Sequence, residues 1–290
     1  MKHKLTLLVL FIAPMIFSQS FNKEIRIDSI PNLIGKFTKE ALLKEPYAAW
    51  FEKNYNEYEP DAEVISLLEN ELSKYTITLF MGTWCGDSKI EVSRFYKIME
   101  AVNFPLDRIT AIAVSNQRET YKQSIGGEQE GFNIHRVPTF ILYKNGKEVN
   151  RIIEHPITTL EEDLWNSIQD NYTPNYDGVT YINSLLEKMG VEKFRKKQLA
   201  IARKVQNKIT KFSELNTYSS VLFYAKRTEE GIAIAELNTQ LYPSEVSGYI
   251  NLGNKYSYLQ NKEKAMHYYK KALSLDPKNN MAKKGIELLL

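Results

Sequence analysis

The alternation of apolar and polar positions divides the chain into two parts with different periods. In the first part, helix-like patterns at residues 61–72 and 85–102 alternate with uninterrupted apolar runs at 76–81 and 109–114. Continuous β-rich runs between amphipathic helices are typical of strands that are buried on both faces of a sheet. This order predicts an α/β domain with the two runs as buried strands.

A hairpin and a closing helix follow in the same part. Residues 139–143 and 148–153 are rich in apolar side chains and are joined through Asn145-Gly146. That pair favours the positive backbone angles of a two-residue hairpin loop. A helical pattern at 160–168 completes the predicted α/β domain.

The second part of the chain has a helical pattern throughout. Turn-forming residues are concentrated at 171–178, which predicts a linker. Beyond it, Ile201, Val205 and Ile209 recur every four residues, as on a helix with one buried stripe. The predicted organisation is an N-terminal segment at 1–20, an unassigned extension at 21–60, an α/β domain at 61–170, a linker at 171–180 and a helical domain at 181–290.

The helical domain contains an internal repeat of about 34 residues. Gly253 and Ala265 are small residues where two paired helices would approach closely, and Pro277 would end the second helix. This pattern resembles the tetratricopeptide repeat (TPR) family. The whole signature is met, at Tyr249, Leu252, Gly253, Tyr256, Ala265, Tyr269, Ala272 and Pro277.

The clear copy of the repeat occupies residues 246–279, and a degenerate copy occupies 212–245. Two copies fall short of the three or so that a stable stack of such repeats needs. We therefore expect the helices at 179–210 to supply the missing packing surface. The resemblance implies a groove that binds a protein or peptide partner.

The first twenty residues have the pattern of a secretory signal peptide. Two lysines precede an apolar run at 5–17, and small polar residues follow at 18–20. The run is short for a membrane span, so a membrane anchor is the alternative interpretation. We expect cleavage near Ser18 or Ser20. The mature protein would then be extracytoplasmic, in a periplasm, with no membrane span.

Cys85 is the only cysteine of the 290-residue chain. It lies in the run Trp-Cys-Gly-Asp-Ser at 84–88, between a predicted strand and a predicted helix, and Val137-Pro138 follows later in the chain. This arrangement resembles the thioredoxin family, whose active site reads Trp-Cys-Gly-Pro-Cys at a strand-to-helix turn and faces a cis-proline. The resemblance implies a thioredoxin-like fold, with Cys85 as the nucleophile, Trp84 shielding its thiol and Pro138 beside the substrate strand.

Several departures separate this run from the family pattern. Ser88 replaces the second cysteine, so the resemblance implies a single-thiol protein that forms mixed disulfides and needs another thiol to resolve them. Leu79 stands where the family has a buried acid. After Gly86, Asp87 places a carboxylate that opposes thiolate formation, although it suits a helix N-terminus. Ser88 with Glu91 also fits a capping box, and helix capping is the alternative role of Ser88.

His135 and Arg136 precede Val137 in the loop that would face the nucleophile. The functional interpretation is that Arg136 offsets the charge of Asp87 and that His135 accepts a proton. The alternative is that both are solvated loop residues. Cys85 with one histidine is too small a ligand set for a structural zinc site, so we expect no metal and no other cofactor.

Charge is distributed unevenly along the chain. Residues 181–290 hold 19 Lys or Arg and 10 Asp or Glu, whereas residues 1–180 hold 19 and 25. The two parts could therefore attract each other, but ordinary solvated surfaces are the simpler interpretation. Nucleic acid is not an expected partner of an exported chain.

Two functions are consistent with these patterns. In the first, Cys85 of an exported thioredoxin-like protein forms mixed disulfides with client proteins or small thiols, while the TPR helices recruit a protein partner. In the second, the α/β domain is a redox-inactive scaffold, and the protein acts as an interaction module through its TPR helices. Whether the chain is an enzyme depends on which of the two holds.

Overall fold

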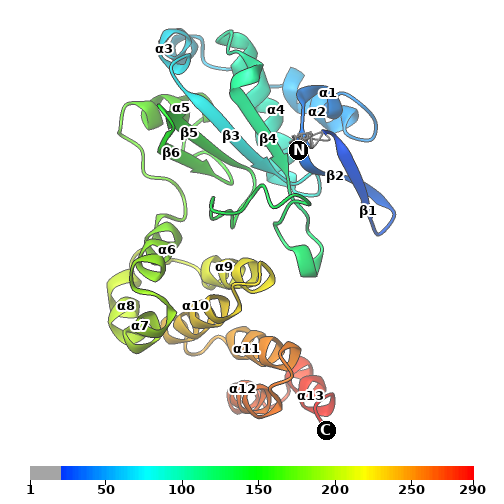
Figure 1. Cartoon of the computed structure of the whole chain (residues 1–290), viewed down its shortest axis with the longest axis vertical. Helices are drawn as coiled ribbons and strands as arrows, with labels where there is room; N and C mark the ends of the chain where they lie inside the picture. The colour runs from blue at the N-terminus through cyan, green and yellow to red at the C-terminus, as the bar shows by residue number, and fades with distance from the viewer. Residues whose placement is uncertain (1–20) are drawn as a thin grey trace, which may run out of the picture.

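In the computed structural model, which describes residues 21–290, a mixed α/β region is followed by a helical region (Figure 1). The segment predicted to be a signal peptide lies outside the described residues. Over residues 21–290 the strands form one six-stranded sheet in the order β1-β2-β4-β3-β5-β6. Their bounds are Lys23–Ile27 (β1), Ile30–Phe37 (β2), Thr76–Met81 (β3), Ile109–Ala113 (β4), Thr139–Lys144 (β5) and Lys147–Ile153 (β6).

The two apolar runs predicted as buried strands are β3 and β4, and they pair in parallel at the centre of the sheet. The other neighbouring pairs are antiparallel. The predicted hairpin is β5–β6, in which Asn145 and Gly146 have φ of 52° and 74°. These positive angles are those that a two-residue loop requires.

The segment left unassigned at 21–60 belongs to the same sheet and core. Strand β2 pairs with β4, with Gly35 opposite Ala113. Helices α1 (Lys39–Leu42) and α2 (Ala48–Asn56) follow, and Phe51 of α2 is buried in the main core. The α/β region therefore begins well before residue 61.

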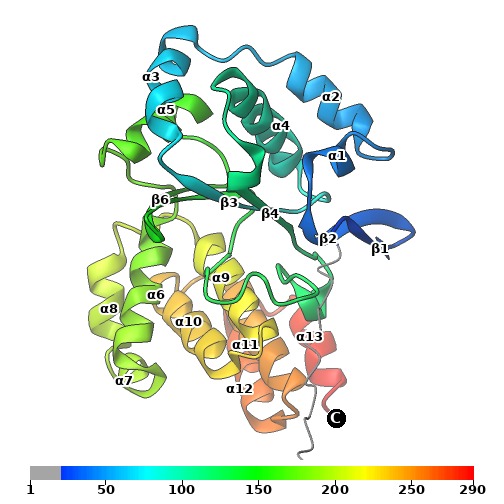
Figure 2. The ribbon, with the colours of Figure 1, turned by 45° about the horizontal axis from the view of Figure 1, so that its top comes forward.

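The side chains of β3 alternate between the two faces of the sheet. Leu79 and its neighbours on one face enter the main core beneath α4 (Gly86–Ala101), whereas Phe80 enters a smaller cluster on the opposite face. Helices α3 (Ala62–Leu72), α4 and α5 (Leu160–Ile168) lie on the first face, and the helical region lies on the second (Figure 2). The apolar Leu79 is fully buried there, as a strand between two packed layers requires.

The helical region begins at Asp177, inside the stretch predicted as a linker. Its first three helices each bury apolar side chains in one cluster. The predicted stripe residues Ile201, Val205 and Ile209 all belong to this cluster, although α8 ends at Val205 and Ile209 follows in the loop. Helix α9 adds Tyr218 to the same cluster, so these helices supply the packing surface that two repeats lack. The bounds are Asp177–Met189 (α6), Val191–Lys196 (α7), Gln198–Val205 (α8), Phe212–Tyr224 (α9), Thr228–Leu241 (α10), Val246–Tyr258 (α11), Lys262–Leu275 (α12) and Asn280–Glu287 (α13).

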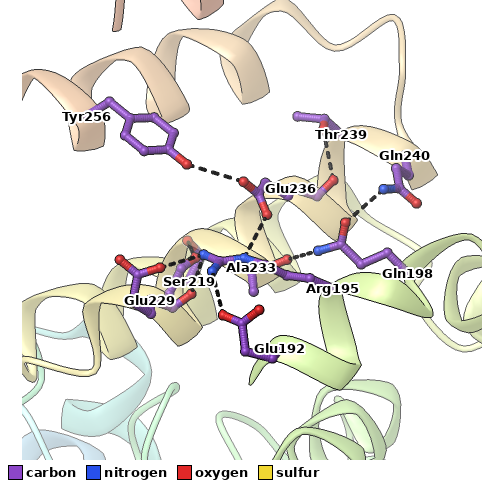
Figure 3. A network of polar contacts seen from close by, with 11 residues as sticks. Glu192, Arg195, Gln198, Ser219, Glu229, Ala233, Glu236, Thr239, Gln240 and Tyr256 are labelled. Atoms are coloured by element: carbon purple, nitrogen blue, oxygen red, sulfur yellow. Dashed lines mark hydrogen bonds and ion pairs between the residues drawn. The ribbon is translucent and has the colours of Figure 1, made fainter. Parts of the chain in front are cut away.

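A polar network ties these first helices to the repeats (Figure 3). Arg195 of α7 pairs with Glu229 and Glu236 of α10 at 2.8 and 3.3 Å, and Glu236 accepts a hydrogen bond from Tyr256 of α11. Gln198 of α8 donates to a backbone carbonyl of α10. The Arg195 guanidinium therefore joins α7 to α10, and the hydrogen bond from Tyr256 to Glu236 joins α11 to the same network.

The α11–α12 pair has the close approach that the signature predicts. A Cβ atom on Gly253 would lie 2.6 Å from the ring of Tyr269, so only glycine fits there. Helix α12 ends at Leu275, immediately before the Asp276-Pro277 pair. The α9–α10 pair repeats the arrangement, since a Cβ on Gly231 would meet the backbone of α9 at 2.7 Å.

Candidate functional site

Cys85 lies at the point where β3 gives way to α4. It is the N-cap residue of α4, in extended conformation, and its N–H donates to the carbonyl of Gly82 at 2.9 Å. A side chain on Gly82 would collide with the indole of Trp84. The half-buried thiol donates to the carbonyl oxygen of Val137 at 3.2 Å. The turn thus presents the sulfur at the positive end of a 16-residue helix.

The Val137–Pro138 peptide bond is cis, as the resemblance implies. Val137 and Pro138 are both buried, and Val137 belongs to the apolar cluster that includes Phe80. Thr139 hydrogen-bonds the carbonyl of Arg136 at 2.8 Å. These contacts hold the Val137 carbonyl against the sulfur.

Trp84 closes one side of the site. Its indole N–H donates to the carbonyl of Val114 at 2.8 Å, and its ring packs against the same apolar cluster. The side chain remains half-exposed next to Cys85. It is therefore fixed in place but still able to contact a partner.

Ser88 does not cap the helix, because α4 begins at Gly86 and Ser88 is already inside its first turn. Its buried hydroxyl accepts a hydrogen bond from the N–H of Gly82 at 3.2 Å. The predicted capping box with Glu91 is therefore wrong, since the N-cap position belongs to Cys85. Gly86 and Asp87 are exposed on the first turn, where the carboxylate complements the helix dipole.

His135 is neither a surface residue nor placed to act as a base. It is 2% exposed, between the rings of Tyr176 and Tyr218, each with its centroid 5.8 Å away. Its Nδ1 hydrogen-bonds the carbonyl of Asn133, and its buried Nε2 has no hydrogen-bond partner within residues 21–290. Burial lowers the pKa of His135 to about 3, so the imidazole is neutral and a poor proton acceptor at neutral pH.

Arg136 faces the helical region instead of Asp87. Its guanidinium pairs with Glu154 at 3.1 Å and lies over the ring of Tyr176. It also donates to the backbone carbonyl of Ser213 at 3.3 Å. The residue thus links the cis-proline loop and Glu154, which follows β6, to the start of α9, and the sequence prediction missed this role.

Lys122 is a site residue that the sequence analysis did not identify. It is 5% exposed, and its ammonium lies 5.2 Å from the centroids of both Trp84 and Tyr121. Burial lowers the pKa of Lys122 to about 8; the charge of Arg136 acts in the same direction, while Cys85 acts in the opposite one. Lys122 belongs to a polar stretch without periodicity, so no sequence signal distinguished it from a solvated lysine.

The described part of the chain contains no group of three or more His, Cys, Asp or Glu side chains that could hold a metal ion. In the same residues, no helix has the length and apolarity needed to cross a membrane.

Residues 246–279 match the family model described as tetratricopeptide repeat. This span covers α11 and α12 with the loops beside them. No curated protein gives a significant match to the chain. The protein therefore combines a mixed α/β region with a helical region that contains a TPR repeat, an architecture consistent with a role in protein interaction.

Proposed function

We propose that this protein is a single-thiol, thioredoxin-like interaction protein. In this view Cys85 forms a mixed disulfide with a protein that the helical region recruits. The order β3-α4-β4 followed by β5-β6-α5 supports a thioredoxin-like fold for the α/β region. The observation that carries the proposal is the half-exposed Cys85 sulfur at the N-terminus of α4, held 3.2 Å from the carbonyl beside Pro138.

The chemistry is one half of disulfide exchange. The thiol of Cys85 loses its proton to solvent, and the thiolate attacks one sulfur of a partner disulfide. A new bond joins Cys85 to that sulfur, and the second partner sulfur leaves as a thiolate. Both the α4 N-terminus and the ammonium of Lys122 place positive charge where the attacking sulfur is negative.

Because residue 88 is a serine and not a second cysteine, the reaction stops at the mixed disulfide. The Ser88 hydroxyl cannot attack a disulfide as a thiolate would, and it is already engaged with the N–H of Gly82. Release of the partner therefore requires an external thiol. A protein of this kind holds its partner covalently until a second reductant acts.

A redox-inactive scaffold is the second candidate. The observation in its favour is that the Cys85 thiol donates its hydrogen to the Val137 carbonyl, a contact available only to the neutral form. In that case the helical region alone carries the function. For either candidate we propose export, from the pattern of residues 1–20.

Glutathione disulfide tests the two candidates directly. The folded protein is incubated with it at neutral pH, and the intact mass is recorded with time. We expect one glutathione adduct, absent in Cys85→Ser and retained in the exposed control Ser274→Ala. Modification that appears only after denaturant is added would favour the scaffold and overturn the exchange mechanism.

A further inference from the structure

One end of the sheet is an open edge formed by β1, which among the described residues pairs with β2 only. Figures 1 and 2 show β1 at the outer rim of the α/β region, with no labelled element beyond it. Lys23, Glu24 and Arg26 are exposed, whereas Ile25 and Ile27 are partly buried. An open edge of this kind presents unpaired backbone N–H and C=O groups to which another strand can add.

At the opposite end of the sheet, side chains already occupy the edge formed by β6. The N–H of Arg151 donates to the side-chain oxygen of Asn150 at 2.9 Å, and the Asn150 amide donates to the carbonyl of Tyr172 at 3.0 Å. Within residues 21–290, no side chain hydrogen-bonds the backbone of Glu24 or Arg26. The two ends of the sheet therefore differ, and β1 is the end that can accept a further strand.

The loop of the β1–β2 hairpin fixes the pattern of its backbone hydrogen bonds. Asp28 and Ser29 form a two-residue loop with φ of 50° and 68°, and Ile27 lies opposite Ile30. The closing pair of such a loop exchanges both backbone hydrogen bonds. Pairs that exchange hydrogen bonds then alternate along the hairpin with pairs that do not.

This alternation determines which groups of β1 face the open edge. Arg26 lies opposite Pro31, and Glu24 lies opposite Leu33, so both fall on pairs that do not exchange hydrogen bonds. Proline is compatible with such a pair because it has no N–H to donate. The N–H and C=O groups of Glu24 and Arg26 therefore point away from β2.

A second copy of β1 fits this edge in an antiparallel register centred on Ile25. Glu24 of each copy then lies opposite Arg26 of the other, and each of these pairs exchanges both backbone hydrogen bonds. Directly opposite side chains have Cβ atoms about 5 Å apart, so each carboxylate meets a guanidinium. Glu24 and Arg26 form no ion pair within the described part of the chain. Charge and hydrogen-bond pattern thus favour the same register.

The alternative registers that use the same backbone groups bring like charges together. One places Glu24 opposite Glu24, and another places Arg26 opposite Arg26 and Glu24 opposite Asp28. Like charges that lie directly opposite each other destabilise a strand pair. Charged residues on an edge strand usually prevent pairing. In β1 their order is complementary to itself, so they attract a second copy in one register.

We propose that β1 pairs with β1 of a second copy of this chain, so that two sheets become one continuous sheet across a two-fold axis. The edge uses neither Cys85 nor the TPR helices, so this inference is independent of the proposed function. The dimer would present two helical regions together, which raises the avidity for a partner with two binding sites. Because the shared edge is five residues long, we expect a weak dimer, with a Kd on the order of 100 µM.

Charge reversal tests both the dimer and its register. Sedimentation equilibrium of the purified protein is recorded at concentrations on both sides of the expected Kd. Glu24→Arg and Arg26→Glu should each weaken self-association at least about tenfold, because each places like charges opposite one another. An equimolar mixture of these two variants should associate, since one then offers two positive side chains and the other two negative ones. The double variant, in which the charges exchange places, should recover the association of the wild type.

The matched controls lie on α2, where Glu52→Arg and Lys53→Glu change charge at exposed positions away from the edge. Both should associate like the wild type. A wild-type protein that stays monomeric, single variants that associate as strongly as the wild type, or a mixture that stays monomeric would each overturn the inference. The mixture and the double variant contain the same substitutions as the single variants, so their association shows that the substituted chains are folded.

Discussion

Protonation of His135 should limit the stability of the protein in acid. The imidazole is enclosed by the rings of Tyr176, from the start of the helical region, and Tyr218 of α9. Its Nε2 is buried and has no hydrogen-bond partner in the described part of the chain, and Arg136 adds a positive charge nearby. Protonation would therefore place a desolvated positive charge close to Arg136, so it is unfavourable in the folded state.

The size of the effect follows from the two protonation equilibria. The pKa of His135 falls from 6.5 in an unfolded chain to about 3 in the folded protein. Between these values the unfolded chain binds a proton that the folded protein does not, so stability falls as the pH falls. From pH 7 to pH 4.5 the loss amounts to about 2.5 kcal/mol.

The substitution His135→Phe removes this proton-binding group and keeps an aromatic ring between the two tyrosines. At pH 7 the change should be small, about 1 kcal/mol or less, because a hydrogen bond to Asn133 is lost while an unpartnered buried nitrogen is removed. Between pH 7 and pH 4.5 the variant should lose about 2.5 kcal/mol less stability than the wild type.

Urea unfolding at the two pH values measures this difference. Trp50, Trp84 and Trp165 all lie in the α/β region, so tryptophan fluorescence reports that region, while circular dichroism reports the helices as well. The matched control is His267→Phe, at an exposed position on α12. Equal pH dependence in the wild type and His135→Phe would refute the reasoning.

Two further outcomes are expected. Lys122→Met should slow alkylation of Cys85 by iodoacetamide at pH 7 several-fold, because it removes the ammonium next to Trp84 that stabilises a negative sulfur. The control is Lys89→Met, which removes an ammonium that lies over Trp50. Equal alkylation rates in the two variants would show that Lys122 does not act on Cys85. Expression of the full chain in a Gram-negative host should yield a periplasmic protein whose N-terminal sequence begins near Phe21. Recovery of a cytoplasmic protein that still begins at residue 1 would contradict export.

The spacing of apolar residues located most of the helices and strands because each of them buries its side chains in a regular pattern along the sequence. Strand β3 is buried on both faces and α3 is amphipathic, so both carry strong signals. Strand β2 was missed because Gly35 and Asn32 interrupt its apolar residues, and its place in the sheet depends on distant pairing with β4. Cys85 and Pro138 were found through their motif.

The links between the two regions were not visible in the sequence. The sequence predicts a linker between the α/β domain and the helical domain, yet Tyr218 packs against His135, and the Ser213 carbonyl accepts from Arg136. These contacts join residues about eighty positions apart, and no local pattern encodes them. Lys122 was missed for the same reason, since its burial depends on Trp84 and on the fold of its loop.

The loop after β4 is closed by two backbone hydrogen bonds, from Ser115 to Gln123 and from Lys122 to Ser115. Within this short closed segment, Arg118 lines a cavity together with Tyr224 of α9 and Lys255 of α11, and Lys122 lies next to Trp84 near Cys85. A ligand that displaced the segment at one end would change the free energy of binding at the other. Thermodynamic linkage makes such an effect reciprocal. If a ligand in the cavity changed the affinity for a partner at Cys85 by some factor, that partner would change the affinity for the cavity ligand by the same factor.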